Sequence, residues 1–182
     1  MDYIKYFSKY KRLFKTKKAV EYFVKSYKNI DKRVEIMKYY WPKTGKPMWK
    51  VTWKDLADRV FSEFIRLKNA DSKGKCKCVT CWIIQDRTVI QNGHFITRWN
   101  MKRRYIISNC HPQCYKCNCL LHGNYQQYTL YMINEYWMGY VNSMLNDSTI
   151  YKIKQQEYEQ RILFRYDEIV EKKRKLSKVK KV

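Results

Sequence analysis

Apolar residues recur at helical spacing in several stretches of this chain. Within residues 1 to about 30 they predict two amphipathic helices joined by a basic run. Residues 52 to about 69 carry one apolar stripe behind Thr52-Trp53-Lys54-Asp55, a capping box that marks a helix start. Residues 125 to 145 and 151 to 172 have the same spacing. The chain is therefore expected to be mostly helical.

Between these helices the pattern predicts loops and one hairpin. Residues 30 to 51 hold two prolines and a glycine and are expected to form a linker with little regular structure. The β-rich stretches 82–84 and 88–96 flank a polar turn at residues 85–87. Such a pattern predicts a hairpin with His94 near the end of its second strand.

Two Cys-x-x-Cys pairs predict a structural zinc site. Each short knuckle offers two thiolates, and a tetrahedral Zn²⁺ takes four. The ligands are expected to be Cys78, Cys81, Cys114 and Cys117. Cys110 and Cys119 are left over, as is Cys76, which competes with Cys78 for the register of the first knuckle. Cys78 is preferred because it completes the Cys-x-x-Cys spacing with Cys81.

The charge of the chain indicates a polyanionic partner. Lys and Arg total 39 against 16 Asp and Glu, a formal net charge of +23, which favours nucleic acid. Cations beside the predicted knuckles, Arg98, Arg103 and Arg104 with Lys102, are expected to contact DNA phosphate, although a solvated loop is the alternative. Residues 172–182 hold seven cations and no acid, and are expected to be a disordered tail that adds non-specific affinity.

Cysteine usage and hydropathy bear on the compartment. The chain has seven cysteines, no secretory pattern at its N-terminus and no apolar run near 18 residues in length. Thiols used for metal rather than for disulfides indicate a reducing interior. We therefore expect a cytoplasmic protein with no membrane partner.

Polar residues placed around the knuckles are the candidates for catalysis. His94 lies between the two cysteine pairs, Asn109 precedes the second pair, and Asn118 directly follows Cys117. A short helix is predicted to start at Cys117, which would put Asn118 and His122 at i and i+4 on one face. This order of residues resembles the HNH, or ββα-metal, nucleases.

A longer resemblance covers about residues 52 to 130. The matching segments resemble the phage recombination protein family NinG, also called Rap: Gly93-His94-Phe95-Ile96-Thr97-Arg98, Arg104-Tyr105, Asn109-Cys110-His111-Pro112-Gln113-Cys114, Cys117-Asn118, Leu121, Gly123-Asn124 and Tyr128. The four cysteines, the central histidine and the Cys-Asn pair are also similar to phage endonuclease VII, a dimeric junction resolvase.

The resemblance implies a structure-specific endonuclease that cuts branched DNA, including Holliday junctions and D-loops, in phage recombination. It implies that His94 is the general base on water, that Asn109 is the middle polar residue, and that Asn118 lies on the side of a single Mg²⁺ or Mn²⁺ ion. The zinc would then be a scaffold without an open coordination position.

One position departs from the HNH pattern. Many HNH sites have an aspartate metal ligand just before the histidine, whereas this chain has Gly93 there. His122 is the candidate for the second ligand of the catalytic ion, on the expected i,i+4 geometry. His111 is the weaker alternative because it lies beside Pro112 in the approach to the knuckle.

These expectations combine into an α+β fold, a mostly helical chain around a small zinc-stapled ββα-metal core of the HNH or treble-clef type. The expected parts are a basic helical region with its linker (1–51), the nuclease core (52–146), and a helix with a basic tail (147–182). Two symmetric cuts at a junction favour a homodimer. The alternatives are an HNH nicking or homing nuclease on duplex DNA, and a non-catalytic zinc protein that binds DNA.

Overall fold

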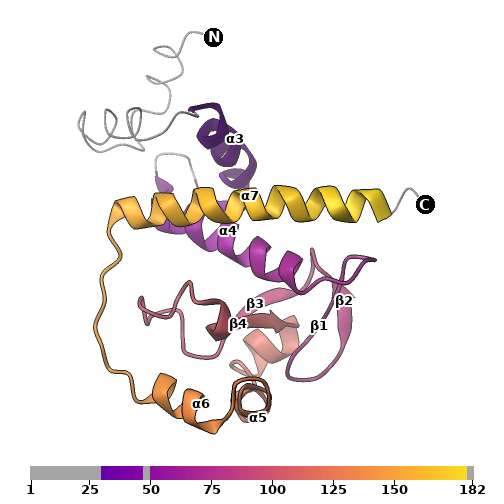
Figure 1. Ribbon diagram of the computed structural model, residues 1–182, viewed down its shortest axis with the longest axis vertical. Helices are drawn as coiled ribbons and strands as arrows, with labels where there is room; N and C mark the ends of the chain where they lie inside the picture. The colour runs from indigo at the N-terminus through magenta and orange to yellow at the C-terminus, as the bar shows by residue number, and fades with distance from the viewer. Residues whose placement is uncertain (1–29, 47–49, 180–182) are drawn as a thin grey trace. The chain divides into compact units, whose positions relative to one another are not determined.

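The computed structural model describes residues 30–46 and 50–179, and the helices expected before residue 30 lie outside this range. It has the expected α+β class, and it divides into two compact units, Met1–Val60 and Phe61–Val182. The elements follow the chain in the order α3 (Ile30–Tyr40), η2 (Pro42–Thr44), α4 (Trp53–Lys68), β1 (Lys75–Lys77), β2 (Ile84–Asp86), β3 (Gln91–His94), η4 (Ile107–Asn109), β4 (Cys110–Gln113), η5 (Lys116–Leu120), α5 (Tyr125–Tyr136), α6 (Met138–Leu145) and α7 (Gln155–Val179) (Figure 1).

Helix α3 corrects the expectation of a linker over residues 30–51. Its buried residues Ile36, Met37 and Tyr40 have helical spacing, which outweighs the loop signals that follow them. Those signals act only after the helix has ended. Pro42 begins a short 3₁₀ turn, and Gly45 closes it at φ 67°.

The start of α4 has the predicted capping box. The amide of Asp55 donates to Thr52 Oγ1 at 3.2 Å, and the amide of Thr52 donates to Asp55 Oδ2 at 2.9 Å. Lys46 pairs with the same carboxylate at 2.7 Å. Burial raises the pKa of Asp55, but the hydrogen bonds from Lys46 and Thr52 outweigh it and lower the pKa overall. Two amide donors at the helix start are thereby satisfied.

Strand pairing corrects the predicted hairpin. Strand β2 pairs with β1, so that Cys76 lies opposite Gln85, and β3 pairs with β4, so that His94 lies opposite Cys110. The first knuckle is the cause, because its amides fold β2 back onto β1: Cys78 N donates to the carbonyl of Ile83 at 2.8 Å. The chain then turns after β2, and β3 finds its partner beyond a loop of fifteen residues, 95–109.

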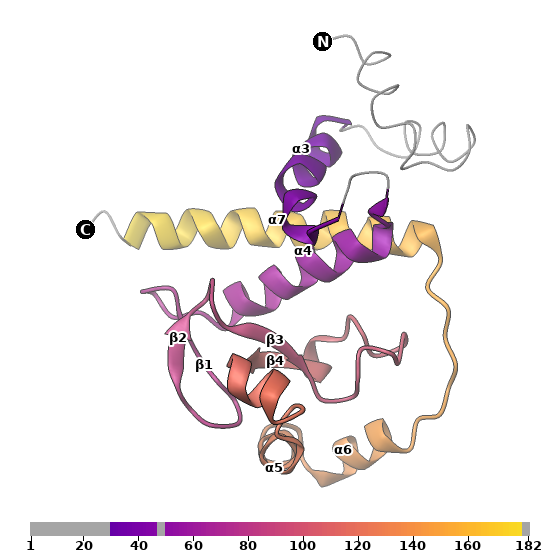
Figure 2. The same cartoon turned by 180° about the vertical axis from the view of Figure 1, so that it is seen from behind.

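The second unit is layered around the β3–β4 pair. In Figures 1 and 2, α7 and the second half of α4 lie on one side of this pair, with α5 and α6 on the other. The core between the strands and α5–α6 consists of Val79, Phe95, Tyr128, Met132, Val141 and Met144. The β3–β4 pair therefore lies between two groups of helices.

Helix α7 packs through the predicted apolar stripe and runs further than expected. Ile162, Tyr166 and Ile169 are buried, whereas Val170 is exposed. Lys173 pairs with buried Glu63 of α4 at 2.6 Å. The expectation of a disordered tail from residue 172 is therefore wrong up to Val179. Glu171 pairs with Arg174 and Lys175 at i+3 and i+4, which supports helix rather than disorder.

The single helix expected over residues 125–145 is two helices, broken at Trp137. This residue has φ 61° and ψ 156°, a conformation that glycine ordinarily occupies. Its ring lies where a side chain at Gly139 would be, since a Cβ there would come within 1.8 Å of Trp137 Cζ3. Gly139 therefore makes room for the break.

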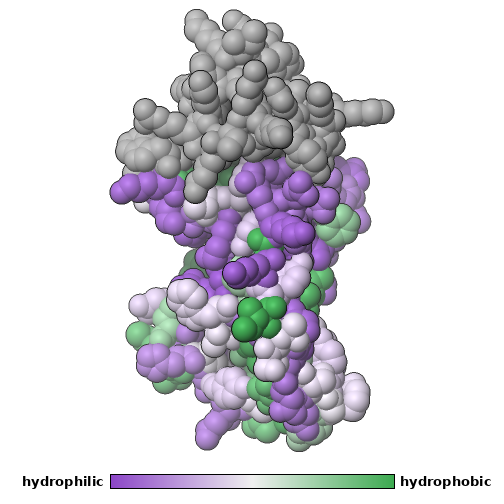
Figure 3. Space-filling view, turned by 90° about the vertical axis from the view of Figure 1, so that its left-hand side faces the viewer, coloured by the Kyte–Doolittle hydropathy of each residue, from purple (hydrophilic) through white to green (hydrophobic). Residues whose placement is uncertain are grey.

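The surface combines polar and apolar side chains. On the face drawn in Figure 3, hydrophobic groups reach the surface between hydrophilic ones. The exposed aromatic residues include Trp82, Trp99, Tyr115 and Trp137. Among the described residues, no helix is both long and apolar enough to span a membrane.

Candidate functional site

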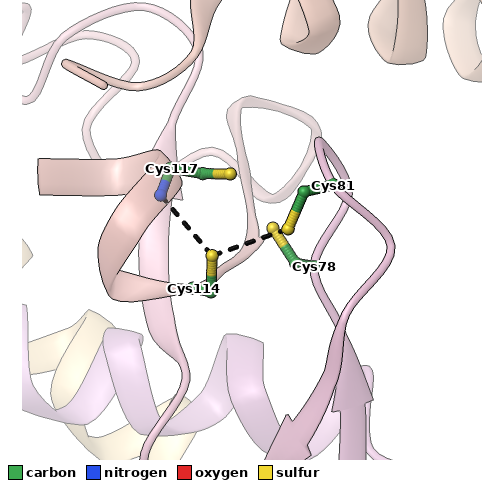
Figure 4. A group of neighbouring side chains, drawn as sticks. All are labelled: Cys78, Cys81, Cys114 and Cys117. Atoms are coloured by element: carbon green, nitrogen blue, oxygen red, sulfur yellow. Dashed lines mark hydrogen bonds between the residues drawn. The ribbon is translucent and has the colours of Figure 1, made fainter. Parts of the chain in front are cut away.

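The four predicted cysteines converge on one point. The sulfur atoms of Cys78, Cys81, Cys114 and Cys117 all lie within 4.8 Å of one another (Figure 4). Cys81 Sγ and Cys114 Sγ are 3.6 Å apart. Four thiolates placed tetrahedrally at the usual Zn–S distance of about 2.3 Å would be separated by about 3.8 Å. The donor set and its spacing fit a structural zinc ion, as the sequence predicted.

Hydrogen bonds favour a thiolate at Cys78, whereas burial raises the pKa of Cys81 and of Cys114. Burial raises the pKa of Cys78, but hydrogen bonds from Thr80 and from nearby amides outweigh it and lower the pKa to about 6. Asn124 Nδ2 donates to Cys117 Sγ at 3.7 Å. Burial and the neighbouring thiols raise the pKa of Cys81 to about 12. Since like charges repel, an ion is what would let all four thiols ionise together.

The other three cysteines lie outside this group. Cys76 is buried in β1 and its Sγ donates to the carbonyl of Arg66 at 3.1 Å. Burial raises its pKa to about 11, which suits a packed thiol better than a ligand. Cys110 is buried in β4, and Cys119 is exposed. The cluster of four thiols thus includes Cys78 and not Cys76, in line with the preferred register.

His94 is the last residue of β3, as predicted, and its ring is oriented by the loop that follows. Its Nε2 lies 3.2 Å from the carbonyl oxygen of Arg104. A carbonyl oxygen can only accept, so Nε2 is the donor, and in a neutral ring Nδ1 is then the nitrogen with the lone pair. His94 is half-buried, which leaves part of the ring within reach of solvent.

Asn109 is fully buried and fixes the loop between β3 and β4. Its Oδ1 accepts from Ile96 N at 2.7 Å, and its Nδ2 donates to the carbonyl oxygens of Ile96 at 2.9 Å and Arg103 at 3.1 Å. All its hydrogen-bonding capacity is directed at the protein backbone in this arrangement. Asn109 therefore positions the loop between β3 and β4 and does not offer its side chain to a substrate.

The three arginines of the predicted phosphate clamp differ in exposure. Arg104 is only 3% exposed, and its guanidinium donates to the carbonyl oxygen of Arg98. Arg103 pairs with Asp147 at 2.8 Å, and Lys102 pairs with the same carboxylate at 2.8 Å. Arg98 is the arginine of the three that is exposed. Arg104 departs from the prediction because the loop uses its donors to fold.

Asn118 and His122 are not arranged as predicted. Residues Lys116–Leu120 form one π-helical turn, and His122 lies beyond it at φ 48°, exposed. A π-helix has more residues per turn than an α-helix, so the i,i+4 geometry does not apply. The side-chain amide of Asn118 instead donates to Gln91 Oε1 at 2.7 Å. Gln91, which sequence reasoning missed, is its partner on β3.

Gln113 explains the glycine that stands before His94. A Cβ added to Gly93 would come within 2.1 Å of Gln113 Oε1, so the glutamine fills the room that an aspartate would need. Gln113 is fully buried and donates to the carbonyl oxygen of Gly123 at 2.7 Å. No alternating sequence pattern reveals this contact. It becomes visible only through the register that sets β3 against β4.

His111 belongs to the core. Its two ring nitrogens lie 3.0 Å from the hydroxyls of Tyr128 and Tyr136, and burial lowers its pKa to about 4. Within the described ranges, the four cysteines are the group of three or more His, Cys, Asp or Glu side chains that could hold an ion. A second, carboxylate-based metal site is thus not preformed there.

Comparison with known proteins gives one match. The family model described as Bacteriophage Lambda NinG protein matches residues 7–178 of the chain. No curated protein and no solved structure matches.

Proposed function

This chain belongs to the NinG family, which implies a role related to phage recombination, and on that premise we propose that it is an endonuclease. Its substrate would be branched DNA, such as Holliday junctions and D-loops. The observation that carries the proposal is His94 at the end of β3, where the Arg104 carbonyl holds Nε2 of the ring and directs Nδ1 away from that bond. A protein that only bound DNA would not need this oriented base.

In the proposed reaction, Nδ1 of His94 takes a proton from water. The water oxygen forms a bond to phosphorus while one ester P–O bond breaks, and solvent protonates the departing oxygen. The hydrogen bond from Nε2 to Arg104 keeps the ring fixed while Nδ1 accepts the proton. A positioned general base of this kind typically contributes about 10²–10⁴-fold to the rate.

A divalent ion, Mg²⁺ or Mn²⁺, would stabilise charge on the scissile phosphate when bound. Asn118 fits one ligand position: Gln91 orients its amide, and within the described part of the chain its Oδ1 has no hydrogen-bond partner. Magnesium usually keeps several waters and binds substrate phosphates. DNA oxygens and water would therefore supply the other ligands.

The proposed partner is DNA, because a net charge of +23 suits a polyanion. Arg98 is the clamp residue best exposed for phosphate contact. Resolution of a four-way junction needs two cuts, which a homodimer would provide with two equivalent sites.

A second candidate function is a non-catalytic zinc protein that binds DNA. It is favoured by Gly93 and Gln113, which leave no carboxylate at the position before His94. Cutting of a four-way junction with and without Mg²⁺ separates the two functions. Comparison with plain duplex separates the branched substrate from a nicking or homing activity.

The decisive variants are His94→Ala and His94→Gln, assayed on a labelled four-way junction. Glutamine keeps an amide donor for the Arg104 carbonyl but lacks the base, so it controls for loss of loop structure. Both should lose about 10²–10⁴-fold in cutting rate while retaining zinc and junction affinity. His122→Ala, an exposed histidine outside the proposed site, should cut normally. Normal cutting by His94→Gln would refute the proposal.

A further inference from the structure

The loop between β3 and β4 carries its most exposed aromatic residue at a turn. Asn100 N donates to the carbonyl oxygen of Thr97 at 3.0 Å, which makes Arg98 and Trp99 the two central residues of a four-residue turn. Trp99 is 82% exposed, and Arg98 beside it is also exposed. Both side chains are therefore exposed at the same loop tip.

This turn has a braced base. Buried Asn109 binds the backbone of Ile96 on one side and of Arg103 on the other. The guanidinium of buried Arg104 donates to the carbonyl oxygen of Arg98 itself. A loop held by buried side chains presents its tip in one orientation, so little ordering remains to be done when a ligand binds.

The same brace connects the turn to the proposed general base. The carbonyl oxygen of Arg104 accepts from Nε2 of His94, and Trp99 follows His94 by five residues. Only a short segment held by these hydrogen bonds separates the two residues. A ligand stacked on Trp99 would therefore lie at a fixed position relative to His94.

Core packing does not account for Trp99, since most of its surface meets water. Single exposed apolar side chains are common, but a tryptophan on a rigid turn beside a cation is the arrangement that stacks nucleobases. Every base has a π-face, whereas in continuous duplex those faces are covered by their neighbours. At a branch or gap they become accessible.

We propose that the Arg98–Trp99 turn binds an unstacked nucleobase at a DNA branch, with the indole stacked on the base and Arg98 on the adjacent phosphate. This inference rests on the proposed function in taking DNA as the partner. It adds the feature by which the protein would distinguish branched from continuous DNA, and it does not require cutting.

The test measures binding without added divalent ion, so that no cleavage occurs. The DNAs are a four-way junction and a gapped duplex with one unpaired 2-aminopurine, against a fully paired duplex of equal length. Trp99→Ala should lose about 5- to 150-fold in affinity for the first two and less than about twofold for the third. Trp99→Phe should retain most of the affinity. Wild type and Trp99→Phe should quench 2-aminopurine, whereas Trp99→Ala should not.

Phe164→Ala is the matched control, because Phe164 is an exposed aromatic residue on the α7 surface and alanine favours helix. It should bind all three DNAs like wild type. An equal loss on paired and unpaired DNA in Trp99→Ala would overturn the inference alone, as would unchanged binding, which would leave Trp99 for a protein partner. Wild type that bound none of the DNAs would overturn the proposed function as well.

Discussion

Gly93 and Gln113 are predicted to be energetically coupled, which tests the packing beside His94. In Gly93→Ala the new methyl group would meet Gln113 Oε1 at 2.1 Å, Cδ at 2.7 Å and Cγ at 2.8 Å. Three such contacts cannot be relieved by moving one terminal atom. The glutamine or strand β3 has to shift.

The expected cost follows from the contacts on each side. Overpacking of a buried site typically costs about 1–3 kcal/mol, and Gly93→Ala should fall in that range. Gln113→Ala loses the hydrogen bond to the Gly123 carbonyl at 2.7 Å and a weaker one to Thr80 at 3.3 Å, for about 1–3 kcal/mol. Alanine at 113 also removes all three clashing atoms. The loss of unfolding free energy in the double variant should therefore be smaller, by at least about 1 kcal/mol, than the sum of the losses in the two single variants.

Urea unfolding measures this cycle in four zinc-loaded proteins: the wild type, the two single variants and the double variant. The comparison requires that all four have the same m-value. Strict additivity, or a Gly93→Ala protein as stable as wild type, would show that Gln113 does not fill the space over Gly93. The same cycle with Gly93→Asp asks whether an aspartate, which many HNH sites have before their histidine, is tolerated here once Gln113 is shortened.

Two further predictions concern the metal centre and the buried histidine. Cys117→Ser should lose zinc and unfold, since structural zinc supplies on the order of 10 kcal/mol, whereas Cys76→Ser should keep one zinc by metal analysis; a folded, zinc-free Cys117→Ser protein would contradict this. In the folded protein the pKa of His111 is lowered to about 4, below its value in the unfolded chain. The contribution of neutral His111 to the unfolding free energy is therefore fully present above pH 6.5 and is lost as the pH falls toward 4, by about 3 kcal/mol. Its replacement by phenylalanine should flatten the pH dependence of unfolding free energy in that window, and an unchanged slope in urea titrations would exclude His111 as the cause.

Local chemistry made part of the structure predictable from sequence. The capping box at Thr52 and each Cys-x-x-Cys pair depend on residues three positions apart, with geometry fixed by hydrogen bonding or by coordination. His94 at a strand end followed from β-rich composition before it. In each case the interaction that fixes the structure is encoded within a short spacing.

The failures came from contacts between distant segments. The predicted hairpin assumed that neighbouring strands pair, but the knuckle draws β2 back to β1. Arg104 was expected to contact phosphate, but its side chain is buried within its own loop, which composition cannot show. The pairing of Asn118 with Gln91 depended on a π-helical turn, and 27 residues separate the two. Sequence spacing carries no information about any of these.

Gly93 and Gln113 pack against each other, because the glutamine side chain fills the space over the glycine. Together they determine which groups can lie beside His94. With Gln113 over Gly93, the protein offers no carboxylate at that position, and under the proposed function Asn118 would contribute a single neutral oxygen. A neutral ligand binds Mg²⁺ weakly, so phosphate oxygens have to complete the coordination. Under the proposed function, the ion and the DNA would each raise the affinity of the other, because coupling between two ligands is reciprocal. DNA that failed to place its phosphate beside His94 would then also fail to recruit the ion. Cutting would depend on DNA geometry both through the position of the phosphate and through binding of the ion.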